Sequence, residues 1–144
     1  MRKFVEGSWT NDTVELRLPL KLEYSPILRA TTGAVAGVIS FNYDEIMQLR
    51  VAVSEVFEQA MKYVTPGRGV SEVNELAVRF LGYLDRIEIL IAGPKDYTSH
   101  LNTQEGKESL ALLRTLTDEV KFDAEVAGKS LVRMVKYKSL MEGT

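Results

Sequence analysis

The sequence contains no cysteine and a single histidine, His100. Without cysteine the chain has neither disulfides nor a thiolate metal site, so it is expected to fold in a reducing compartment. No apolar run approaches the roughly 20 residues of a membrane span, and the run at Phe4-Val5 is too short for a signal peptide. We therefore predict a cytoplasmic protein that has no membrane partner.

An excess of charge of one sign is also lacking. The chain has 18 Lys and Arg against 20 Asp and Glu, a formal net charge of −2. This balance leaves no electrostatic footprint for sequence-independent binding of DNA or RNA, so nucleic acid is not an expected partner. The composition is that of a globular protein, with 45% hydrophobic residues, and neither a repeat nor a long linker divides the 144 residues. We predict a single domain over residues 1–144.

Hydrophobic periodicity predicts both strands and helices. Period-two alternation predicts strands over residues 14–18, 75–80, 86–91, 120–123 and 131–137. Apolar residues at helical spacing predict helices over Ser25–Phe41, Tyr43–Val64 and Glu108–Leu116. This order favours an α+β fold, a two-layer sandwich with the helices on one face of a mostly antiparallel sheet and a more polar opposite face.

The second predicted helix carries the candidate chemistry. Glu55 and Gln59 are four residues apart and project from one helical face, the minimum geometry for a general base beside a metal ligand. A solvated helix face that pairs with Lys62 is the plainer alternative. His100 lies in a polar stretch and has no Cys or second His to complete a ligand set, so we interpret it as a surface residue.

Several local motifs point to one known family. They are Leu18-Pro19, Glu23-Tyr24, Tyr43-Asp44-Glu45-Ile46, Val53-Ser54-Glu55 and Thr115-Leu116-Thr117-Asp118-Glu119-Val120. With them the chain, over about residues 13–138, resembles the anti-sigma-factor serine kinases of bacteria. These belong to the GHKL superfamily and have the Bergerat, or histidine-kinase-like ATPase, fold. The resemblance implies that Glu55 holds the general-base position and that Gln59 stands where the family has the Asn that binds Mg²⁺.

The other motifs of the family's ATP site are altered. Where the family has Asp-x-Gly, this chain has Gly93-Pro94-Lys95, followed by Asp96, and where it has a glycine-rich run, this chain has Gly106-Lys107-Glu108. The resemblance thus implies a vestigial ATP site at Gln59, Gly93, Lys95, Asp96 and Gly106. Because the adenine-binding carboxylate and most phosphate-binding glycines are missing, we expect no cofactor, with ATP and Mg²⁺ bound only if the site still works.

Three functions are open at this stage. The first is a regulator of the anti-sigma type, a homodimer that binds a sigma factor or an anti-anti-sigma protein through its first helix and a sheet edge, with impaired or lost ATP binding. The second is a working ATP-dependent serine-protein kinase in which Glu55 is the general base and Gln59 reaches Mg²⁺. The third is a sensor whose residual pocket holds another small ligand.

Overall fold

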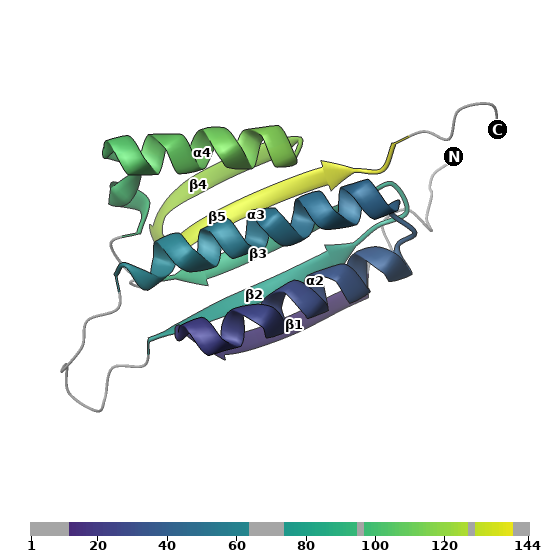
Figure 1. The fold of residues 1–144 in the computed structure, drawn as a ribbon, viewed down its shortest axis with the longest axis horizontal. Helices are drawn as coiled ribbons and strands as arrows, with labels where there is room; N and C mark the ends of the chain where they lie inside the picture. Colours follow the sequence, from purple (N-terminus) through teal and green to yellow (C-terminus); the bar gives the residue numbers. More distant parts are fainter. Residues whose placement is uncertain (1–11, 64–73, 95–96, 127–128, 140–144) are drawn as a thin grey trace.

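The computed structural model describes residues 12–63, 74–94, 97–126 and 129–139. Within these residues, five strands form one antiparallel sheet in the order β1-β2-β3-β5-β4, and the α-helices cover one of its faces (Figure 1). The elements are β1 (Asp12–Pro19), η1 (Leu22–Tyr24), α2 (Ser25–Val38), α3 (Tyr43–Met61), β2 (Glu75–Gly82), β3 (Arg86–Gly93), η2 (Thr98–Asn102), α4 (Gln104–Leu116), β4 (Glu119–Val126) and β5 (Lys129–Tyr137). The predicted α+β sandwich and its order of elements are confirmed.

The two central strands place one row of apolar side chains beneath the helices. The row consists of every second residue of β2 and β3. Its members are at most 2% exposed: Leu76, Val78, Phe80, Ile87, Ile89 and Ile91. Helix α3 lies over the middle of the sheet (Figure 1) and buries Leu49, Val53, Val56, Phe57 and Ala60. Because burying one such side chain contributes roughly 1.5–3 kcal/mol, this packing fixes α3 against the sheet. No helix among the described residues is long and apolar enough to cross a membrane.

The turn between α2 and α3 shortens the first predicted helix. Helix α2 ends at Val38 rather than Phe41, because Ser40 adopts the left-handed conformation with φ 75°. Asn42 then begins α3: its side chain accepts from the Glu45 amide at 2.8 Å, and the Glu45 carboxylate accepts from the Asn42 amide at 2.9 Å. This reciprocal capping box holds the start of α3 in place.

Two other helix boundaries also differ from the prediction. Helix α4 begins at Gln104 rather than Glu108, because Thr103 caps it by accepting from the Gly106 amide at 3.0 Å. Helix α3 ends at Met61, and the predicted end, Val64, lies outside the described residues. The earlier start of α4 brings its first turn close to η2, which bears on the site below.

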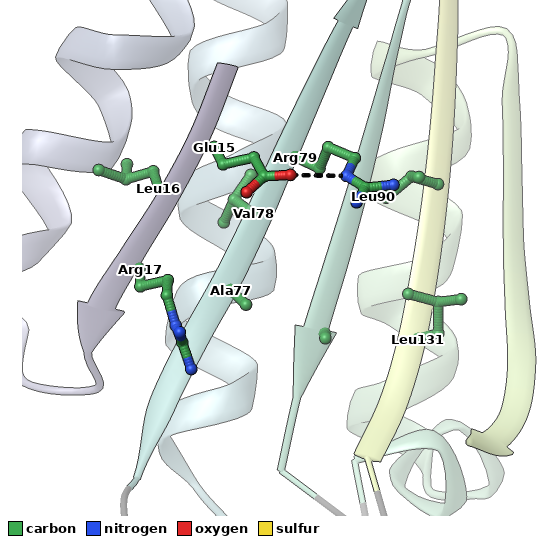
Figure 2. A pocket seen from close by; sticks show the side chains of 9 residues that line it. Glu15, Leu16, Arg17, Ala77, Val78, Arg79, Leu90 and Leu131 are labelled. Carbon is green, nitrogen blue, oxygen red and sulfur yellow. Dashed lines mark hydrogen bonds and ion pairs between the residues drawn. The ribbon is translucent and has the colours of Figure 1, made fainter. Parts of the chain in front are cut away.

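The sheet face opposite the helices carries charged side chains, as predicted, around an apolar hollow. Arg79 donates to Glu15 across β1 and β2 at 3.2 Å (Figure 2). Beside this pair lies a cavity of about 400 Å³, whose lining includes Ala77, Leu90 and Leu131. The hollow is shallow because these side chains are only half-buried and no described element covers them.

Candidate functional site

Glu55 and Gln59 lie one turn apart near the C-terminal end of α3 and contact each other directly. The Gln59 Nε2 group donates a hydrogen bond to Glu55 Oε2 at 3.0 Å. Gln59 is 7% exposed, and its neighbour Ala60 is fully buried. The candidate base and the candidate metal ligand are therefore neighbours, as the helical spacing predicted, but each already has a partner in the other.

The single histidine completes this cluster, and its interpretation as a surface residue is wrong. His100 is 6% exposed, and its Nε2 lies 2.7 Å from Gln59 Oε1. The loop carries it inward because η2 folds back against the end of α3. No local pattern signals this contact, since 41 positions separate the two residues. Sequence reasoning therefore missed His100 as a member of the site.

The orientation of the Gln59 amide follows from its contacts with Glu55 and His100. A carboxylate only accepts hydrogen bonds, so the amide NH₂ group must face Glu55 and the amide oxygen must face His100. A carbonyl oxygen also only accepts, so His100 carries a proton on Nε2. The row Glu55, Gln59, His100 is thus a directed chain of hydrogen bonds that begins at an imidazole and ends at a carboxylate.

Aromatic rings pack around the imidazole. The Tyr63 ring meets His100 edge-on, with centroids 5.4 Å apart, and the Tyr97 ring stacks at 6.5 Å with an interplanar angle of 24°. Tyr97 is 2% exposed, and burial, followed by the negative charge of Glu55, raises the pKa of its phenol. The phenol therefore stays neutral and brings no charge to the side of the imidazole that it covers.

Gly93, at the end of β3, faces this aromatic cluster. A Cβ atom built on Gly93 would lie 3.5 Å from Leu76, 3.9 Å from Ala60 and 4.0 Å from Tyr97, which are ordinary contact distances. The glycine is buried, and the space beside it is filled by side chains of the chain itself. The next two residues that the resemblance assigned to an ATP site, Lys95 and Asp96, lie outside the described residues.

Gly106, in the first turn of α4, packs against the backbone of η2. A Cβ atom at this position would lie 2.0 Å from the carbonyl oxygen of His100, so only glycine fits without a backbone shift. The Gly106 amide donates to Thr103 Oγ1 at 3.0 Å, and that hydroxyl donates to the His100 carbonyl at 2.6 Å. The amide that a phosphate would need is already bound by the helix cap.

Two acidic residues of α4 differ in what they contact. Glu105 forms an ion pair with Lys62, the C-cap residue of α3, and this hydrogen bond lowers the pKa of the Glu105 carboxyl. Glu108, which stands in the altered glycine-rich run, is exposed and accepts from Gln104 Nε2 at 3.2 Å. Of these two carboxylates, that of Glu105 contacts the end of α3, where it pairs with the Lys62 ammonium group.

In this structure, the atoms that a magnesium nucleotide would use are hydrogen-bonded within the chain. The Gln59 oxygen, which would have to bind Mg²⁺, accepts from His100, and the Gly106 amide is used by Thr103. By the family resemblance, Gly93 stands where a carboxylate would hydrogen-bond adenine, and the Tyr97 ring lies 4.0 Å from a Cβ atom built on Gly93. Within the described parts of the chain, no group of three or more His, Cys, Asp or Glu side chains is placed to hold a metal ion.

The architecture is that of the histidine-kinase-like ATPase fold. A crystal structure of the RsbU and RsbW domains of a Mycobacterium tuberculosis protein matches 90% of this chain with a TM-score of 0.62 and 16% sequence identity. This chain covers 33% of that longer one, and the likeness concerns the fold alone. No family model matches the sequence.

Comparison with curated relatives identifies the family. The serine-protein kinase RsbW of Bacillus pumilus is 38% identical, with 80% of each chain covered. The proteins of the same name from Bacillus velezensis and Bacillus subtilis are 34% and 33% identical, covering 88% and 76% of this chain and 86% and 77% of theirs. The chain therefore belongs to the RsbW serine-protein kinase family, as its motifs indicated.

Proposed function

We propose that this chain is a cytoplasmic regulator of the anti-sigma type that acts by binding a protein partner and does not need ATP to do so. The observation that carries the proposal is the hydrogen bond from His100 to the Gln59 oxygen, which uses the atom that Mg·ATP would require. Membership of the RsbW family supports a sigma factor or an anti-anti-sigma protein as the partner. The resemblance further favours a homodimer.

The surface that suits such a partner lies along α2 and the edge strand β1. Val38 is 79% exposed, Ile27 is 44% exposed and Val14 is 39% exposed. A cavity of about 340 Å³, lined in part by Val14, Val38 and Leu84, opens between the end of α2 and the sheet. Because β1 pairs only with β2 among the described strands, its outer edge offers backbone groups as well as apolar side chains.

Binding of a purified sigma factor, measured by calorimetry with and without Mg·ATP, tests this function. We expect the same affinity in both conditions. Val38→Lys should weaken binding by at least about tenfold, since a charge would be placed in an apolar contact. Leu112→Lys is the matched control, because Leu112 is an exposed apolar residue on a different helix and is 38% exposed. Binding that requires nucleotide, or that is equally weakened by both variants, would contradict the proposal.

A working serine-protein kinase is the second candidate, because Glu55 is retained and the relatives are named as kinases. In that function Glu55 would accept the proton of the substrate hydroxyl, and the Gln59 oxygen would first have to leave His100. Glu55→Gln should then lower phosphoryl transfer to the partner by about 10²–10⁴-fold. A regulator that only binds would show no transfer in the parent protein and unchanged partner affinity in the variant.

A further inference from the structure

We propose that His100 closes the ancestral nucleotide site from within, its imidazole N–H taking the place of the divalent cation at the Gln59 oxygen. This inference rests on the proposed function and extends it to the control of the same site. In this proposal His100, the only histidine of the chain, prevents Mg·ATP from binding.

The first step concerns the Gln59 oxygen itself. The His100 N–H lies at hydrogen-bonding distance, 2.7 Å between heavy atoms, and both residues are almost fully buried. A magnesium ion would approach this oxygen to about 2.1 Å and bring its own positive charge. The N–H dipole and the ion would then point their positive ends at each other in a site with little water, so the two cannot share the oxygen.

The second step concerns the NH₂ group of the Gln59 amide, which is hydrogen-bonded as well. Gln59 cannot simply rotate to offer its oxygen elsewhere, because rotation would turn that oxygen toward the Glu55 carboxylate. Two acceptors would then face each other, and the His100 N–H would lose its partner. Glu55, which has no substrate to act on in the binding-only function, therefore holds the amide in the orientation that His100 needs.

The third step is that His100 is held firmly in place. Its carbonyl accepts from Thr103, its backbone packs on Gly106, and its ring contacts Tyr63 and Tyr97. Withdrawing the imidazole would disrupt these contacts together, since η2 joins α4 directly through Thr103. The closure is thus built from the packing of η2 and α4 as well as from one hydrogen bond.

The test uses the full chain, Mg·ATP as the probe and two substitutions. His100→Ala removes the donor, so calorimetry should show Mg·ATP binding tightened by at least about tenfold relative to the parent, as expected for release of one hydrogen-bonded group. His100→Gln keeps an N–H donor at this position and should bind Mg·ATP as weakly as the parent. If His100→Ala is folded by circular dichroism and binds no tighter than the parent, the proposal is wrong.

A measurement on the unmodified protein covers the case in which His100→Ala does not fold. Because His100 is the only histidine, its ring nitrogens give one set of signals in a nitrogen-15 spectrum. We expect an Nε2 proton that exchanges slowly and does not shift when Mg·ATP is added in excess. Fast exchange, or displacement of the signal by the nucleotide, would overturn the proposal. Failure of sigma-factor binding would leave both readouts unchanged, so the two proposals can fail separately.

Discussion

The C-terminal ends of α2 and α3 lie at opposite ends of the helical layer, since the two helices run in opposite directions (Figure 1), and their surroundings differ. At the end of α3, Gln59 is 7% exposed and both ends of its amide are bound by Glu55 and His100. At the end of α2, Val38 is 79% exposed beside an open cavity. The comparison contrasts a cluster whose polar atoms are bound within the chain with an apolar surface, at the opposite end of the helices, that the described residues leave open. The two regions can therefore be altered separately, so that nucleotide binding and partner binding can be tested independently.

The largest expected effect on stability comes from adding one methyl group at Gly106, where α4 packs against η2. Gly106→Ala would place a Cβ atom 2.0 Å from the His100 carbonyl oxygen, so η2 or α4 must shift. We expect the free energy of unfolding to fall by about 3 kcal/mol, the upper range for overpacking of a tight site. Urea unfolding followed by circular dichroism measures it.

Gly37→Ala is the matched control for this prediction. A Cβ atom at Gly37 would meet nothing within 4 Å, and the residue lies in the last turn of α2. This substitution should stabilise the chain slightly, by about 0.5 kcal/mol, because it reduces the freedom of the unfolded chain. An equal fall in the free energy of unfolding for both variants would show that the backbone around Gly106 is packed no more tightly than that around Gly37.

An intermediate effect is expected at the other end of α3, where Glu45 caps the helix and accepts from the Ser139 amide at 2.8 Å. Burial opposes ionisation here, but the hydrogen bonds from Ser139 and Asn42 and the charge of Lys136 prevail and lower the pKa of Glu45. Glu45→Gln should reduce the free energy of unfolding at neutral pH by about 1 kcal/mol, because Gln can still accept from the Asn42 amide but loses the hydrogen bond from the Ser139 amide.

The pH dependence gives this prediction a direction. Because the folded pKa of Glu45 lies below its ordinary value of 4.5, its ionised form stabilises the fold above that value. This contribution is lost as the pH falls through the lowered folded pKa. The difference in unfolding free energy between parent and Glu45→Gln should therefore shrink in acid, and a difference that grows in acid would rule out this role of Glu45.

The smallest effect on stability is expected on the open surface. Val38→Lys should change the free energy of unfolding by less than about 0.5 kcal/mol, because the side chain is mostly exposed and a cation suits the end of a helix. Thermal unfolding measures this change. If the variant were clearly destabilised, its weaker partner binding could result from unfolding. The end of α2 could then not be identified as a docking surface from this variant.

Local patterns in the sequence were sufficient to predict the layers of the fold. The alternation of Leu76, Val78 and Phe80 defines one buried face of a strand, because successive side chains point to opposite sides. The spacing of Glu55 and Gln59 likewise placed both on one face of α3. The sequence also contains a signal for the start of α3, because Asn42 and Glu45 are three residues apart in a capping-box pattern.

The contents of the site were decided by tertiary structure. The family motifs placed Gln59, Gly93 and Gly106 together, but they gave no sign that His100 would turn inward. Its contact with Gln59 spans 41 positions and depends on the packing of η2 against Gly106, where a Cβ atom would collide with backbone. Local sequence fixes which face of a helix or strand is buried, because the backbone repeat determines where side chains point. Which distant side chain fills the space above that face depends on how the loops pack, and this only the folded chain decides.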